Sequence, residues 1–145
     1  MWRRSDIARL ASLPPAERRV AFAAIFLLLS YSLRLRLFGL RAAQAQMPRR
    51  AAVASPLAAP RIAAIVAAAA RRIPMGGGCL PASLALQHLL AAGGIASELR
   101  LGVGVAGGRL EAHAWVERDG AIVFDTRDPR NDFQAFERAI APPAA

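Results

Sequence analysis

The sequence predicts an α+β fold in which several helices precede a small antiparallel sheet. Long apolar stretches interrupted by proline and glycine fill residues 1–72, whereas residues 98–126 alternate apolar with polar or small side chains, as half-buried strands do. The size agrees, since 145 residues, 55% of them hydrophobic, suit one domain with a modest core. We expect a basic, apolar helical region over 1–72 and a mixed α+β core over 73–145.

Proline and glycine mark the limits of the predicted helices. Pro15, Pro60 and Pro81 can each stand in the first turn of a helix, because an N–H group there has no helical partner to lose. Gly39 and Gly93 favour helix ends. The predicted helices cover residues 2–11, 15–38, 61–72 and 80–92. A loose connection is expected over 40–59.

Alternation and turn signals predict the strands of the second region. They cover residues 98–105, 110–117 and 121–126, and a short helix is predicted over 133–140. A three-residue loop with Gly120 in the left-handed conformation would pair Glu117 with Ala121. His113 would then lie opposite Asp125 on the same face of the sheet. A two-residue loop would instead turn Asp125 to the other face.

Charge is distributed unevenly along the chain. All nineteen basic residues are arginine, and residues 1–72 have a net charge of +11 against −2 for residues 73–145, which gives +9 for the whole chain. A basic region suggests an acidic partner, an anionic membrane surface or nucleic acid. The sequence has neither zinc-finger spacing nor an RNA-binding aromatic cluster, which argues against nucleic acid. We expect a partner protein or peptide.

The apolar run over residues 20–33 is fourteen residues long. A membrane-spanning helix needs about 20 residues, so a buried or partner-facing helix is favoured over a membrane-surface helix, a signal peptide or an anchor. The only cysteine, Cys79, excludes internal disulfides and a multi-cysteine metal site and fits a reducing compartment. We therefore expect a cytoplasmic protein.

Cys79 is the candidate nucleophile. It stands where a glycine-rich loop, residues 76–78, enters a predicted helix. The free N–H groups and the dipole of a helix N-terminus favour a thiolate. The same geometry offers backbone donors for a developing oxyanion, for which Gly78, Cys79 and Leu80 are candidates. The alternative is that Cys79 is a small buried apolar residue.

A nucleophilic cysteine needs a base. His88 lies nine residues further along the same helix, about 13 Å away, so it is expected at the helix surface or the core edge. His113 lies in a predicted strand between two alanines that leave room around it, although it could instead be a hydrogen-bonded core histidine. Asp125 is the candidate that orients the imidazole, with Asp128 in reserve; Asp125 could alternatively cap a turn. The sequence has no paired-histidine motif or phosphate-binding loop, so no metal or cofactor is expected.

Several stretches together resemble one family, the transglutaminase-like leader peptidases of lasso-peptide biosynthesis, known as B proteins. The resemblance covers about residues 73–127. The matching stretches are residues 79–86 (CLPASLAL), 99–103 (LRLGV) and 112–117 (AHAWVE), followed by Asp125.

The resemblance implies a papain-like core, in which a cysteine-bearing helix packs on a small sheet, and a triad of Cys79, His113 and Asp125. It implies a peptidase that cuts the leader from a ribosomally made precursor peptide, after which an ATP-dependent cyclase closes the lasso ring. Pro81 and Ala82 stand where the family often has a charged residue. An acyl-transferring enzyme and an inactive peptide-binding scaffold are the alternative readings.

The N-terminal region differs from one known family arrangement. Some members carry a winged-helix-like leader-binding domain with three strands ahead of the peptidase, and the apolar, arginine-rich residues 1–72 do not resemble it. The chain therefore resembles the split form, which relies on a separate leader-binding protein. We expect residues 1–72 to be a docking surface for that protein, the leader or the cyclase.

Overall fold

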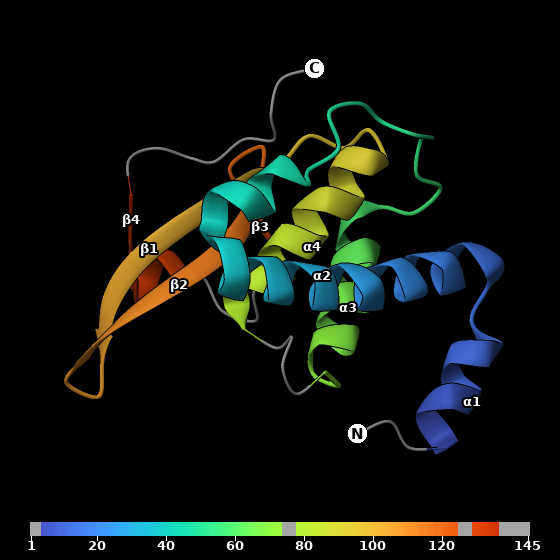
Figure 1. The fold of residues 1–145 in the computed structure, drawn as a ribbon, viewed down its shortest axis with the longest axis horizontal. Helices are drawn as coiled ribbons and strands as arrows, with labels where there is room; N and C mark the ends of the chain where they lie inside the picture. The colour runs from blue at the N-terminus through green and yellow to red at the C-terminus, as the bar shows by residue number, and fades with distance from the viewer. Residues whose placement is uncertain (1–3, 74–77, 125–128, 137–145) are drawn as a thin grey trace.

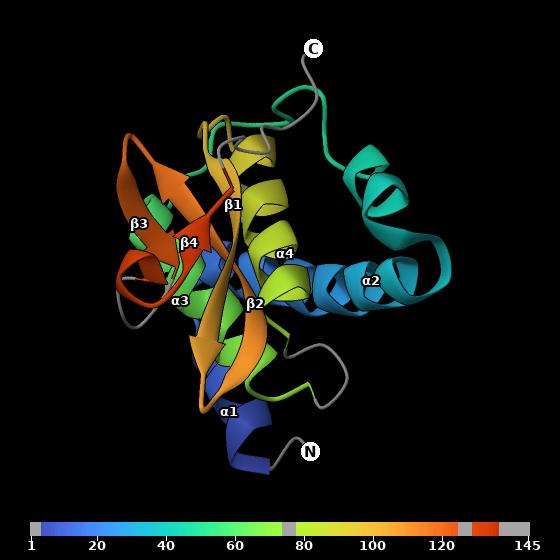
Figure 2. The same cartoon turned by 90° about the vertical axis from the view of Figure 1, so that its left-hand side faces the viewer.

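The computed structural model describes residues 4–73, 78–124 and 129–136 and places helices on one face of an antiparallel sheet, which confirms the predicted α+β class (Figures 1 and 2). The helices are α1 (Arg4–Ser12), α2 (Pro15–Ala45), α3 (Ala59–Ala70) and α4 (Cys79–Ala92). The strands are β1 (Glu98–Ala106), β2 (Arg109–Arg118), β3 (Ala121–Phe124) and β4 (Gln134–Ala135), with a short 3-10 turn, η1 (Pro129–Asn131), before β4. The strand order is β3-β2-β1-β4.

The elements form three layers. The sheet is one outer layer, α3 and α4 pack on it as the middle layer, and α2 packs on α3 and α4 from the other side (Figure 2). The core is apolar and draws on both predicted regions of the chain. Its fully buried members include Leu28 of α2, Ile62 of α3, Leu84 of α4, and Leu99 and Val116 of the sheet. Residues 1–72 and α4 therefore share one core.

The second helix differs from its predicted end. Gly39 adopts φ 76° and ψ −175°, which interrupts the helix, but the chain then re-enters helical geometry and continues to Ala45. The prediction that the helix ends at Gly39 is therefore wrong, although Gly39 does break the helix axis. A positive φ of this kind is readily accessible to glycine.

The β2–β3 turn also differs from the prediction. Arg118 pairs with Ala121, which leaves a two-residue loop of Asp119 and Gly120, both with positive φ (51° and 76°). This is the geometry of a type I′ hairpin turn. The predicted three-residue loop and its pairing of Glu117 with Ala121 are wrong. A register shift then follows, because Glu117 pairs with Ile122 whereas Val116 pairs with Phe124.

The terminal helix predicted over residues 133–140 is wrong in its described part. Gln134–Ala135 form β4, which pairs with Gly102 and Val103 of β1. The backbone N–H of Phe136 extends this contact by donating to the Leu101 carbonyl at 2.8 Å. Residues 137–140 of that prediction lie outside the described residues.

A buried polar contact joins α2 to α4. The Tyr31 hydroxyl lies 2.9 Å from Nδ1 of His88, and Tyr31 is fully buried. His88 is half-buried, so the expectation that it lies at the core edge is confirmed. Burial lowers the pKa of the His88 imidazole below its ordinary value, because the charged form loses solvation.

Stability is therefore expected to fall as the pH drops through the titration of His88. The unfolded chain takes up this proton near pH 6.5, whereas the folded chain takes it up only at lower pH. Between the two pKa values the unfolded state binds more protons, so the free energy of unfolding decreases with falling pH. Urea unfolding above and below about pH 6.5 should show this loss. It should be smaller in His88→Gln, and an equal loss in both proteins would contradict the assignment.

Candidate active site

Cys79 is the first residue of α4. Gly78 precedes it in an extended conformation, with φ −70° and ψ 152°, and accepts the first hydrogen bond of the helix from the Ala82 N–H at 3.2 Å. The N–H groups of Cys79 and Leu80 lie in the first turn, where no earlier helical carbonyl can accept them. The thiol is half-buried and packs against the core. The start of α4 therefore places a sulfur beside two N–H groups that have no acceptor within the helix.

A buried hydrogen bond holds α4 against β2. The Ser83 hydroxyl donates to the Ala114 carbonyl at 3.1 Å, and Ser83 has no exposed surface. Ser83 lies one helical turn after Cys79, and Ala114 directly follows His113. The bond therefore fixes the first turn of α4 beside the centre of β2.

His113 lies on the outer face of the sheet. Ala114 and Val116 of β2 belong to the core under the helices, and side chains alternate between faces along a strand. His113 and Trp115 therefore face outward, and the contacts of their rings are consistent with this orientation. The imidazole of His113 stacks on the Phe133 ring, with centroids 4.9 Å apart and planes at 25°. With its other neighbour, Trp115, the ring centroids are 6.2 Å apart and the planes meet at 23°.

A buried carboxylate completes this outer group. The Trp115 indole N–H donates to Glu117 at 2.8 Å, and the Arg100 guanidinium lies 3.3 Å from the other oxygen of Glu117. Trp115 is fully buried, and Glu117 is only 8% exposed. A buried carboxylate needs such donors because desolvation would otherwise penalise its charge. These two contacts hold the Glu117 carboxylate beside Trp115, on the same face of β2 as His113.

Two glycines of β1 make room for the connection that covers this face. β3 and β4 lie on opposite edges of the sheet, and Asp132 and Phe133, just before β4, lie over its outer face. A Cβ at Gly102, which pairs with His113, would lie 2.9 Å from the Trp115 ring. A Cβ at Gly104 would collide with the Asp132 carbonyl and come within 2.9 Å of the Phe133 ring. Small residues are thus required here.

This cover was not predicted from the sequence, in which Phe133 begins a predicted helix and Gly102 and Gly104 fit the alternation of a strand. Glycine at two successive outward positions of a strand is a signal of close backbone approach. That signal could have indicated that another segment lies over β1.

The predicted site residues are placed as follows. The structure puts Cys79 at the start of α4, on the helix side of the sheet, and His113 on the outer face of β2. The Ser83–Ala114 bond joins the two elements, but it does not bring the two side chains together. The pairing of the thiol with the imidazole stays a prediction. Asp125, Asp128 and residues 76–77 lie outside the described residues, so the orienting role of Asp125 also stays a prediction.

Metal ligation has no support among the described residues. In residues 4–73, 78–124 and 129–136, no group of three or more His, Cys, Asp or Glu side chains could hold a metal ion.

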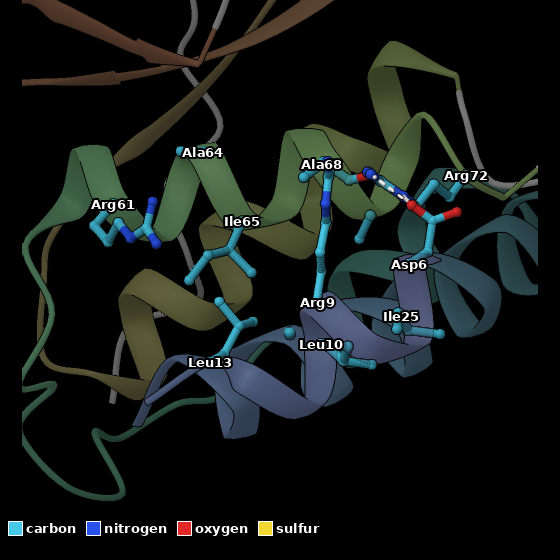
Figure 3. Close-up of a pocket in the computed structure, with 12 residues that line it drawn as sticks. Asp6, Arg9, Leu10, Leu13, Ile25, Arg61, Ala64, Ile65, Ala68 and Arg72 are labelled. Carbon is cyan, nitrogen blue, oxygen red and sulfur yellow. Dashed lines mark hydrogen bonds and ion pairs between the residues drawn. The ribbon is translucent and has the colours of Figure 1, made fainter. Parts of the chain in front are cut away.

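A cavity of about 180 Å³ lies between α1, α2 and α3 (Figure 3). Its lining is mostly apolar, and at its edge Arg72 of the α3 end pairs with Asp6 of α1 at 3.1 Å. None of the lining residues comes from α4 or from the sheet. This cavity is therefore separate from Cys79 and His113.

Comparison with protein families gives one match. The family model described as the transglutaminase-like superfamily matches residues 24–138. The matched segment runs from α2 past β4 and contains both Cys79 and His113. Comparisons with curated proteins and with solved structures found no significant match.

Proposed function

Because the chain belongs to the transglutaminase-like superfamily, a fold of cysteine peptidases and acyltransferases, we propose that it removes the leader from a ribosomally made lasso-peptide precursor. The observation that supports this most is the position of the only cysteine at the first residue of α4, one turn from the bond that fixes this helix beside the His113 strand. The lasso-peptide assignment rests on the resemblance of residues 79–86 and 112–117 to leader peptidases.

The proposed reaction uses the Cys79 thiolate as nucleophile. The sulfur attacks the scissile carbonyl, and the N–H groups of Cys79 and Leu80, with that of Gly78, are the proposed donors to the oxyanion. His113 accepts the thiol proton and donates it to the leaving amine, which releases the C-terminal fragment. Water then hydrolyses the thioester and frees the leader with a new carboxylate. Asp125 is proposed to hold the imidazole in the required tautomer.

This mechanism requires the His113 ring to reach the Cys79 sulfur when the peptide is bound. Catalytic hydrogen bonds are often long in proteins without substrate and tighten on binding. Since the His113 ring lies on the outer face of β2 and stacks on Phe133, whereas Cys79 packs on the helix side of the sheet, peptide binding would have to move β2 or the start of α4 as well as break this ring contact. The proposed reaction needs no metal or cofactor in this chain.

The proposed partners follow from the split arrangement. They are the precursor peptide, a separate leader-binding protein and an ATP-dependent cyclase, all in the cytoplasm. The proposed docking surface is the arginine-rich region over residues 1–72, which packs against α4 and so lies next to the helix that carries Cys79.

Mass analysis of the products tests the proposed reaction. The protein is incubated with the precursor and the leader-binding protein encoded by neighbouring genes. Hydrolysis should give a leader and a core peptide whose masses together equal the precursor plus one water. Acyl transfer, the alternative chemistry of this superfamily, would instead give an amide of larger mass without added water. Unchanged precursor under these conditions would favour a peptide-binding scaffold.

A further inference from the structure

α2 carries a line of exposed apolar side chains on its outer side. Their spacing of four, three, four and four residues puts them on one helix face, over a length of about 22 Å. We name this face the α2 stripe. Its members and their exposed fractions are Phe22 57%, Phe26 67%, Leu29 50%, Leu33 58% and Leu37 62%. A contiguous apolar surface of this kind marks an interaction site more often than chance exposure.

The stripe is exposed because the opposite face of α2 is committed to the core. Ala24, Leu28 and Tyr31 have no exposed surface, and they pack toward α3 and α4. By length and composition α2 could cross a membrane, but 33% of its apolar window is buried inside the protein. If α2 crossed a membrane, these buried side chains would lose their contacts with α3 and α4. An apolar phase can therefore reach α2 only from its outer side.

Positive charge surrounds the stripe. Exposed Arg19 lies at its start, and exposed Arg34 and Arg36 lie near its end. Residues 18–97 contain no Asp or Glu, and Glu17, just before them, is paired with Arg61 at 2.6 Å. A second copy of the chain would bring arginine against arginine at both ends of the stripe in an antiparallel contact, which disfavours self-association. The charge instead fits an anionic surface.

We propose that the α2 stripe docks the protein on an anionic membrane surface, with α2 lying along the plane of the membrane. The Phe and Leu side chains enter the boundary between headgroups and acyl chains, and the arginines reach lipid phosphates beside them. Because α2 forms the layer furthest from the sheet (Figure 2), docking leaves the outer face of β2 directed away from the lipid. This proposal is independent of the proposed peptidase activity, and it places the docking of the proposed protein partners on parts of residues 1–72 other than the α2 stripe.

Flotation with lipid vesicles tests the proposal. The wild-type protein should float with vesicles of phosphatidylcholine and phosphatidylglycerol. Its partition coefficient should fall by roughly tenfold or more on phosphatidylcholine alone, because that lipid has no net negative charge to attract the arginines. Phe26→Ser and Leu33→Ser should each lower binding to the anionic vesicles by roughly tenfold or more, since each removes a large apolar side chain from the lipid. Added salt should weaken binding.

Matched controls separate the stripe from general stickiness. Leu110→Ser removes a side chain that is 76% exposed on β2, outside the stripe, and it should bind vesicles as the wild type does. Cys79→Ala should also bind normally. Circular dichroism melting checks that the serine variants remain folded, as expected for substitutions at exposed positions.

Four results would overturn the proposal. The first is a wild-type protein that stays with the unbound fraction on anionic vesicles, and the second is stripe variants that float as well as the wild type. The third is sedimentation showing wild-type dimers that Phe26→Ser dissociates, because the stripe would then be an interface between two copies. Resistance of the bound protein to alkaline carbonate extraction would likewise contradict surface docking and indicate a spanning helix.

Discussion

Cys79→Ala is expected to abolish precursor cleavage while leaving the fold intact. Cys79 is the only cysteine of the chain, so no other thiol can replace it as the nucleophile. Loss of a covalent nucleophile lowers kcat by about a thousandfold or more. The side chain is half-buried and small, so its truncation should cost about 1 kcal/mol or less of unfolding free energy. Cleavage rates by chromatography and melting by circular dichroism measure the two effects separately.

The single thiol also permits a chemical control. Iodoacetamide should add at most one label per chain, and the fraction of activity lost should equal the fraction of protein labelled. Cys79→Ala should take up no label. Alkylated wild type or Cys79→Ala that cleaves the precursor at the normal rate would show that the sulfur has no catalytic role.

The parts of the fold that follow from local sequence were predicted from it. Proline placed the helix starts well, because its missing N–H acts within one or two residues. The position of Cys79 at a helix entrance followed in this way and is confirmed to within one residue, since α4 begins at Cys79 rather than at Leu80. The strands 98–105 and 110–117 followed from alternation.

The register of the β2–β3 hairpin could not be predicted in the same way. Asp119-Gly120 fits both a two-residue and a longer loop, and a difference of one residue changes every cross-strand partner. The shift between Val116 and Glu117 then changes the register again. Such irregularities depend on what covers the two faces of the sheet rather than on the turn. The predicted position of Asp125 opposite His113 depended on this turn, whereas the family resemblance implied its role separately.

Tertiary contacts also decided the region after Pro129. The segment around Gln134 has no strong strand pattern, but the open edge of β1 offers unpaired backbone groups that a passing chain can join. This pairing places the Phe133 ring against His113, where the two rings stack with centroids 4.9 Å apart. The candidate nucleophile could thus be found from its local setting, whereas the surroundings of the candidate base depend on residues distant in sequence.

Trp115→Ala is expected to destabilise the protein severely. The indole is fully buried on the outer face of the sheet, and its N–H donates to the Glu117 carboxylate at 2.8 Å. Truncation of a buried tryptophan costs about 3–5 kcal/mol of unfolding free energy, and the buried carboxylate of Glu117 would lose a donor as well. Because domains are stable by only about 5–15 kcal/mol, the variant should lose a large share of its stability and melt at a clearly lower temperature.

Companion variants separate the contribution of ring packing to this loss of stability from that of the Trp115–Glu117 hydrogen bond. Trp115 is one of only two tryptophans, so its removal changes the fluorescence signal and urea unfolding must be followed by circular dichroism. Trp115→Phe keeps an aromatic ring but removes the N–H, and it should cost less unfolding free energy than Trp115→Ala.

A double variant tests the hydrogen bond itself. If Glu117→Gln is combined with Trp115→Phe, the combined loss of unfolding free energy should be smaller than the two separate losses added together, because both variants remove the same charge-assisted bond. Strict additivity would show that the carboxylate is held by Arg100 alone, and a wild-type melting curve for Trp115→Ala would show that the outer face of the sheet is not closed by this ring.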